Sequence, residues 1–281
     1  MQGRWVGRGS SNKCSPWYVA QASQRAGNHP LTRHRQRLPA GAAAAVHDGP
    51  VTTLSAASER LLATAASLSD AEWAAPSLCA GWTRAHVLAH LALNAEGLGG
   101  ILRGLRDGVP RTMYVSEERR DGDIDDLVAV AGPAAILERL RAAVAGLDQV
   151  HDVATVLPEG TMFERTPGGR QMSANNVPFL RLREVEIHHA DLGAGYTASD
   201  WPPTTALAFL THSTRQYAGP AGTGFHAVAT DEPARWTFGT PADGAATVAG
   251  PVGPLAWWAT GRDAGDAVVS STGALPDPTG A

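Results

Sequence analysis

The residues with the clearest potential for chemistry lie at positions 183–191, which read REVEIHHAD. Glu184 and His188 stand four positions apart, and residues four apart share one face of a helix. A carboxylate and an imidazole on one face suit zinc or another borderline divalent ion. The alternative is a solvated, charged face. However, Val185 and Ile187 indicate that part of this helix is buried, where Glu and His side chains need partners.

A second segment, GWTRAHVLAHL at positions 81–91, places His86 and His90 four apart. One of these histidines, together with Glu184 and His188, makes a set of two imidazoles and one carboxylate. Ligands in helical bundles project inward from facing helices, and three protein ligands leave the open position of a catalytic zinc site. His90 lies deeper in the apolar run than His86, but the spacing alone leaves both open. An ordinary core or surface histidine is the alternative for each.

Four stretches with apolar residues at helical spacing could position these side chains. They cover residues 51–68, 83–105, 134–148 and 173–192. Their long connections are typical of a four-helix bundle, which we expect over residues 51–200. Residues 107–131, between the second and third stretches, are polar and acidic, and we expect a long loop with some helix there.

The chain changes character after the proline pair at 202–203. One helix is expected at 204–217 and a shorter one at 255–260. Short strand-like runs follow the first of them, at 225–230, 235–238, 246–249 and 267–271. We therefore expect residues 201–281 to form a small α/β domain, which makes the whole chain an α+β protein. Residues 1–50 lack periodicity, and we expect them to be a disordered basic leader.

The composition narrows the classes of function. The chain has 281 residues, of which 43% are hydrophobic and 18% charged, as in ordinary soluble globular proteins. Residues 1–47 hold seven basic residues and no acidic one, whereas the remainder has sixteen arginines against twenty-seven acidic residues. Because phosphate binding needs a basic face, this acidic body argues against nucleic acid as a partner.

Two cysteines, Cys14 and Cys79, are far apart and in no C-x-x-C pattern. We therefore expect neither a disulfide framework nor a cysteine zinc site, and place the protein in a reducing cytoplasm. Neither cysteine stands in a nucleophile context near the metal motifs. Apolar runs stay well below the ~20 residues that span a bilayer, so no membrane attachment is expected.

Four spaced blocks carry a resemblance to a known family. They are GWTRAHVLAHLALNAEGL at 81–98, TMYVSEERR at 112–120, RLREVEIHHADLG at 181–193 and GRDAGDAVVSSTG at 261–273. Together they resemble the mycothiol-dependent maleylpyruvate isomerases, in the same order and over about residues 52 to 277.

The resemblance implies a DinB-like four-helix bundle that carries one zinc ion, and a C-terminal domain similar to sterol-carrier folds. Its zinc ligands correspond to His90, Glu184 and His188, which makes His86 a neighbour. A functionally important arginine of the family corresponds to Arg262. An ordinary surface arginine near a helix end is the alternative reading of Arg262.

The implied reaction is the cis–trans isomerisation of maleylpyruvate to fumarylpyruvate in gentisate-type aromatic catabolism. A mycothiol thiolate, activated by zinc, adds to the double bond, allows rotation and leaves. Arg262 is suited to the dicarboxylate substrate, since its planar guanidinium binds carboxylate through two hydrogen bonds. The alternatives are another mycothiol-dependent reaction, such as S-transfer to an electrophile, or a non-catalytic zinc-binding thiol sensor. We expect a monomer.

Overall fold

The computed structural model describes residues 50–280. The expected leader, residues 1–50, lies outside the described residues except for Pro50. The bundle region contains α1 (Pro50–Ser67), α2 (Asp70–Ala74), α3 (Arg84–Arg106), α4 (Glu117–Val130), α5 (Pro133–Asp148), α6 (Val153–Val156), β1 (Met162–Glu164), β2 (Gln171–Ser173), η2 (Ala174–Asn176) and α7 (Val177–Asp191). The C-terminal region contains η3 (Ala198–Asp200), α8 (Pro203–Gln216), β3 (Thr223–Ala229), β4 (Arg235–Pro241), β5 (Thr247–Gly250), α9 (Val252–Ala259) and β6 (Val269–Ser270).

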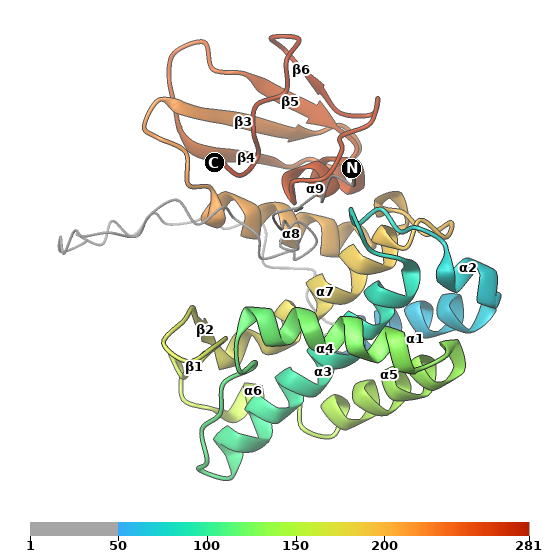
Figure 1. The fold of residues 1–281 in the computed structure, drawn as a ribbon. Coiled ribbons are helices and arrows are strands. Elements are labelled where there is room, and N and C mark those ends of the chain that lie inside the picture. Colours follow the sequence, from blue (N-terminus) through green and yellow to red (C-terminus); the bar gives the residue numbers. More distant parts are fainter. Residues whose placement is uncertain (1–49, 281) are drawn as a thin grey trace, which may run out of the picture.

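The four expected bundle helices are α1, α3, α5 and α7, and they pack against one another (Figure 1). Local signals set their ends. Thr83 is the N-cap of α3, Pro133 occupies the first turn of α5, and Gly193, with φ of 60°, follows the end of α7. Glycine suits that position because a left-handed residue closes a helix C-terminus. The expectation of a helical bundle is therefore confirmed.

The helix expected within the loop at 107–131 is long, since the second half of this segment forms α4 (Figure 1). This helix buries only Arg120 and Ile124, so it shows almost no apolar periodicity. Its signals are those of a helix start instead. Ser116 caps the helix by accepting a hydrogen bond from the Arg119 backbone N–H, and acidic residues fill the first turn. α4 packs beside α3 and adds a fifth long helix to this region.

The C-terminal region forms a four-stranded mixed sheet in the order β4-β3-β5-β6. β3 pairs antiparallel with β4 and parallel with β5, and β6 returns antiparallel to β5. α8 and α9 pack against each other and contact strands of this sheet (Figure 1). β1 and β2 make a separate antiparallel hairpin before α7. The mixed helix-and-sheet fold expected from the sequence is confirmed.

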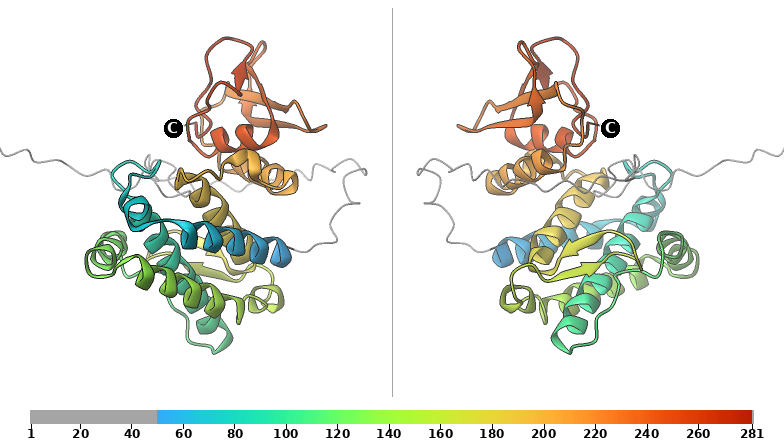
Figure 2. Two further views of the ribbon diagram at one scale, coloured as in Figure 1. Left: turned by 90° about the vertical axis from the view of Figure 1, so that its right-hand side faces the viewer. Right: turned by 90° about the vertical axis from the view of Figure 1, so that its left-hand side faces the viewer.

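One hydrophobic core runs through both regions. It joins bundle residues such as Leu61 and Leu88 to residues of the sheet and α9 such as Phe225 and Leu255. Phe209 of α8 helps to bridge them, with its ring 6.0 Å from that of Phe179 on α7. The side views of Figure 2 show the sheet at one end of the molecule and the bundle at the other. Among residues 50–280, no helix is long and apolar enough to cross a membrane.

Candidate metal centre

Three buried side chains from two helices meet between α3 and α7. Glu184 Oε2 lies 2.9 Å from His90 Nε2 and 3.5 Å from His188 Nε2. One ligand atom from each residue falls within 4.8 Å of the others. Their side chains are at most 3% exposed. The structure therefore brings together the three residues that the sequence singled out.

His86 lies outside this group. Its Nδ1 is 2.7 Å from Thr83 Oγ1, and its Nε2 is 3.7 Å from a carboxylate oxygen of Asp125 on α4. The side chain thus takes part in the N-terminal cap of α3. Polar side chains in the first turn of a helix commonly take part in its cap, because the backbone N–H groups there lack partners within the helix. Of the two histidines that the spacing left open, His90 is the one that faces α7.

The other ring nitrogen of His188, Nδ1, is hydrogen-bonded to Asp191. His188 Nδ1 is 2.8 Å from Asp191 Oδ2, one turn further along α7. Arg262 in turn donates to Asp191 through Nη2 at 2.8 Å and through Nε at 3.3 Å. Arg262 also lies over the ring of Trp257 at 5.4 Å. The arginine singled out by the resemblance therefore lies two hydrogen bonds from His188, where the C-terminal region meets the bundle.

The geometry of His188 fits a divalent metal. Its Nε2 is buried and faces Glu184 Oε2 at 3.5 Å. A carboxylate that binds Nδ1 of a histidine is the usual support of a metal ligand, because it orients the ring with Nε2 toward the ion. Two imidazoles and one carboxylate also match the donor set of catalytic zinc sites. His90, Glu184 and His188 could hold zinc on these grounds.

The electrostatics of the group favour a cation. Burial alone raises the pKa of Glu184, but hydrogen bonds with His188 and His90 outweigh it and hold this pKa well below its usual value. Burial and the charge of Arg120 lower the pKa of His90 to about 3. Burial also lowers the pKa of His188, but Asp191 and Glu184 raise it above its usual value. A charged carboxylate beside a neutral His90 is ready to bind a metal ion.

Asp191 adds a second buried negative charge. Burial raises the pKa of Asp191, but the charge of Arg262 and the hydrogen bond with His188 lower it to about 2. Arg262 therefore balances the charge of Asp191, and Glu184 remains as the anion closest to the two histidine Nε2 atoms. The sequence does contain a signal for the contact between Asp191 and His188, because residues three positions apart are neighbours on one face of a helix.

Cys79 is a neighbour that the sequence analysis missed. Its thiol is buried, and its sulfur lies within 4.8 Å of ligand atoms of His188 and Asp191. These three residues form a second group of metal-ligand type among the described residues. However, His188 Nδ1 and Asp191 Oδ2 are already joined to each other. Cys79 precedes α3 and lies more than a hundred positions from His188, so spacing could not reveal the contact.

Arg120 on α4 contacts His90 at the ring nitrogen that does not face Glu184. Its Nη2 lies 3.1 Å from His90 Nδ1, and its guanidinium lies 5.8 Å from the centre of the Trp82 ring. The side chain is 2% exposed. The sequence analysis assigned Arg120 no role, because nothing in the polar pattern of 107–131 marked it as buried.

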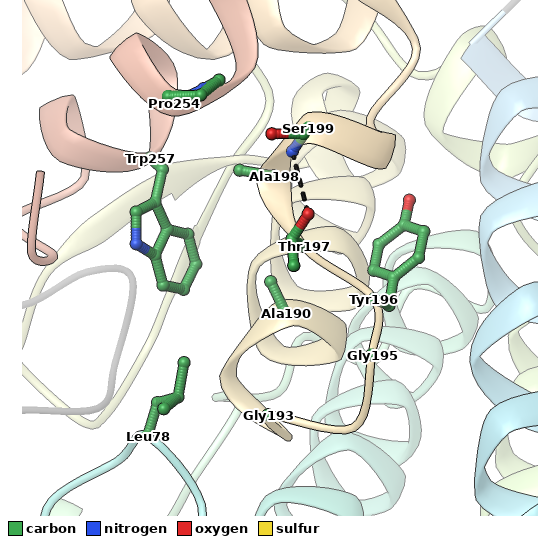
Figure 3. Close-up of a pocket in the computed structure, with 10 residues that line it drawn as sticks. All are labelled: Leu78, Ala190, Gly193, Gly195, Tyr196, Thr197, Ala198, Ser199, Pro254 and Trp257. Carbon is green, nitrogen blue, oxygen red and sulfur yellow. Dashed lines mark hydrogen bonds between the residues drawn. The ribbon is translucent and has the colours of Figure 1, made fainter. Parts of the chain in front are cut away.

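A cavity of about 360 Å³ opens between the end of α7 and α9 (Figure 3). Trp257 and Leu78 lie on one side of it, and Ala190 and Thr197 on the other. Its walls are mainly apolar. None of the three candidate metal ligands lines it, although the ring of Trp257 also carries the Arg262 guanidinium.

Comparisons with known proteins agree with this arrangement. Residues 54–193 match the family described as the mycothiol maleylpyruvate isomerase N-terminal domain. Two solved structures are similar: the crystal structure of the mycothiol-dependent maleylpyruvate isomerase and that of its histidine-to-alanine mutant. Each has 31% sequence identity and a TM-score of 0.66, over 82% of this chain and 94% of the other. No curated protein matches significantly. This likeness in sequence and structure shows that the chain belongs to the family of mycothiol-dependent maleylpyruvate isomerases.

Proposed function

We propose that this protein is a zinc- and mycothiol-dependent isomerase that converts maleylpyruvate to fumarylpyruvate. The observation that carries the proposal is the buried group of His90, Glu184 and His188, found in a chain of this family. Bound zinc would supply a Lewis acid that lowers the pKa of a coordinated thiol and leaves it as thiolate at neutral pH.

The chain's own residues then have distinct tasks. Glu184 and the two histidines bind the ion, and Asp191 keeps His188 oriented. Apolar neighbours such as Val87 and Leu91 exclude water and strengthen the electrostatic interactions of the site. Each task needs a side chain that the fold holds in place.

Arg262 is the proposed catalytic residue. The substrate is a dicarboxylate with a keto group, and addition to its double bond places negative charge on the keto oxygen. A guanidinium stabilises such charge in the transition state and remains protonated throughout. The position of Arg262 beside Asp191, with a side chain 13% exposed, supports this role because it leaves an edge of the group accessible.

The metal assignment is tested by a matched pair of histidine variants. His90→Ala should lose zinc, because it removes one of three ligands, whereas His86→Ala should retain zinc, because His86 is engaged in the helix cap. Elemental analysis of the purified proteins measures zinc. Retention of zinc by His90→Ala together with its loss from His86→Ala would show that the ligand set is wrong.

The reaction is tested on the zinc-loaded protein. Isomerisation of maleylpyruvate should require added mycothiol. Conjugation of mycothiol to a generic electrophile without isomerisation would instead favour S-transfer, and zinc binding with neither activity would favour a thiol sensor.

A further inference from the structure

Two arginines contact one face of α8. Phe209, His212 and Gln216 share this face, because they stand three and four positions apart along the helix. The guanidinium of Arg183 on α7 lies 5.8 Å from the centre of the Phe209 ring. At the other end of the face, Arg170 Nη2 donates to Gln216 Oε1 at 3.0 Å. Two cations, one from α7 and one from the loop between β1 and β2, thus approach α8 from the same side.

Aromatic contacts hold this face of α8 against α7. His212 stands between the two arginine contacts on α8, and its ring centre is 5.3 Å from that of Phe179. Phe179 stands one helical turn before Arg183 on α7, and its ring centre is 6.0 Å from that of Phe209. These ring contacts fix the position of Arg183 beside α8.

Positive charge is concentrated along this face. Burial, together with the charges of two other arginines, lowers the pKa of Arg183 to about 10. Those arginines are Arg262 and Arg170, and Glu184 acts against them. Burial and the charge of Arg183 likewise lower the pKa of His212 to about 3. Cations held this close repel one another, and an anion bound among them relieves the repulsion. Since residues 48–281 as a whole have more acidic residues than arginines, this local group of cations indicates a site for an anion.

The metal ligands lie on the same stretch of α7. Arg183 directly precedes Glu184, and adjacent residues of a helix point about 100° apart. Arg183 therefore faces α8, where Phe209 lies, whereas Glu184 faces α3. Arg262 reaches the last turn of α7 from the C-terminal region, where it binds Asp191. A ligand at the metal centre thus has Arg262 near one end of α7 and Arg183 about two turns earlier.

We propose that Arg183 binds the carboxylate of the substrate that lies farther from Arg262, and that Arg170 attracts the dianion to this site, so that the enzyme selects dicarboxylates. This inference rests on the proposed function, which takes maleylpyruvate as the substrate. Maleylpyruvate carries a carboxylate at each end of a seven-carbon chain, so the end distant from Arg262 needs a cation of its own. Arg183 is buried and its planar guanidinium binds a carboxylate through two hydrogen bonds. Arg170 is exposed and lies at the outer end of the same face.

The first test measures binding by calorimetry on the zinc-loaded protein. The probe is pimelate, a saturated seven-carbon dicarboxylate that cannot isomerise. Arg183→Gln should bind pimelate roughly tenfold or more weakly than the unchanged protein, because it loses a charge-assisted contact. Arg170→Gln should lose less affinity. In both variants, the preference for pimelate over heptanoate, which has a single carboxylate, should shrink.

Arg215→Gln is the matched control, because it removes a positive charge from an exposed position of the same helix. It should keep the pimelate affinity of the unchanged protein. Unchanged affinity in either Arg183→Gln or Arg170→Gln, or an equal loss in Arg215→Gln, overturns the proposal.

Because Arg183 is buried, a second variant guards against loss of folding. Arg183→Lys keeps the charge but loses the planar group that binds a carboxylate through two hydrogen bonds. It should retain zinc and the circular dichroism spectrum of the unchanged protein, and bind pimelate with an affinity between those of the unchanged protein and Arg183→Gln. Pimelate affinity in folded Arg183→Lys equal to that of the unchanged protein overturns the role of Arg183.

The second test concerns the substrate. In zinc-loaded Arg183→Gln, the KM for maleylpyruvate should rise roughly tenfold or more, with a smaller change in kcat, because a ground-state contact with a carboxylate is lost. An unchanged KM in this variant overturns the role in substrate binding. If the unchanged protein binds pimelate through Arg183 but does not isomerise maleylpyruvate, the dicarboxylate site stands and the proposed function fails, so the two failures are distinguishable.

Discussion

Asp191 connects the C-terminal region of the protein to His188 in the bundle. It accepts from His188 on its own helix and from Arg262 after α9. A carboxylate in this position orients the ring and raises its basicity as a ligand. Arg262 can therefore serve the site in two ways, by holding Asp191 and by stabilising negative charge on the substrate.

A double-mutant comparison separates these two roles of Arg262. We expect Arg262→Ala to lower kcat/KM by roughly a hundredfold or more at saturating zinc, and Arg262→Lys to recover only part of this loss. If Arg262 also touches the substrate, the double variant with Asp191→Ala should be less active than Asp191→Ala alone. Equal kcat/KM values for these two proteins would restrict Arg262 to supporting Asp191.

At the scale of elements, α7 is buried on every side and satisfies its polar groups toward different neighbours. Glu184 and His188 face α3, whereas Glu186 binds Arg60 of α1 at 2.7 Å and Tyr196 at 2.6 Å. His189 adds a hydrogen bond of 2.8 Å with Thr64 and lies against the ring of Tyr196. These contacts fix the rotation of α7 about its axis and so keep the metal face directed at α3.

The α1–α7 contact should weaken in acid. Burial and the charge of Arg60 lower the pKa of His189 from 6.5 to about 4. The unfolded chain then binds a proton at a pH where the folded chain does not, so stability falls as the pH drops from about 6.5 towards 4. His189 alone should account for about 1–3 kcal/mol of this loss.

Urea unfolding at pH 7 and pH 4.5 measures the effect. His189→Gln should lose less free energy of unfolding between these two pH values than the unchanged protein does. His226→Gln, on strand β3 and outside the α1–α7 contact, is the control for the loss of one histidine. The same pH dependence in His189→Gln as in the unchanged protein would contradict the assignment.

At the scale of the whole molecule, the site depends on how closely α9 approaches the end of the bundle. A Cβ on Gly253 would lie 2.2 Å from the backbone oxygen of Ala198 in η3. Such a contact is possible only without a side chain. Since α9 leads directly to Arg262, this close approach helps to place the guanidinium beside Asp191.

Gly253→Ala should push α9 away from η3. We expect the free energy of unfolding to fall by about 1–3 kcal/mol, and kcat/KM to fall because Arg262 moves with α9. Gly146→Ala on α5 is the control, because a Cβ there meets open space. It should leave activity unchanged and raise stability by up to about 1 kcal/mol. Chemical denaturation and the maleylpyruvate assay check both variants, and a fully stable, fully active Gly253→Ala would refute the argument.

The sequence was sufficient for features whose causes are local. Helix periodicity and capping depend on neighbours within a few residues, so α1, α3, α5, α7 and α8 were predictable close to their ends. The pairing of Glu184 with His188 follows from the same local geometry. The bounds of α4 were not predicted, because its buried face holds only Arg120 and Ile124 and its helix signals lie in the cap and first turn.

Only the tertiary structure decided which groups meet across the chain. Whether His86 or His90 faces α7 depends on the rotation of α3 in the bundle, which many distant contacts set together. The same holds for Arg120 on His90, for Cys79 beside His188 and for Arg262 on Asp191. The sequence by itself determined the ligand types and their spacing along one helix. The fold determined their partners, because contacts between residues remote in sequence arise from packing, which no local pattern records.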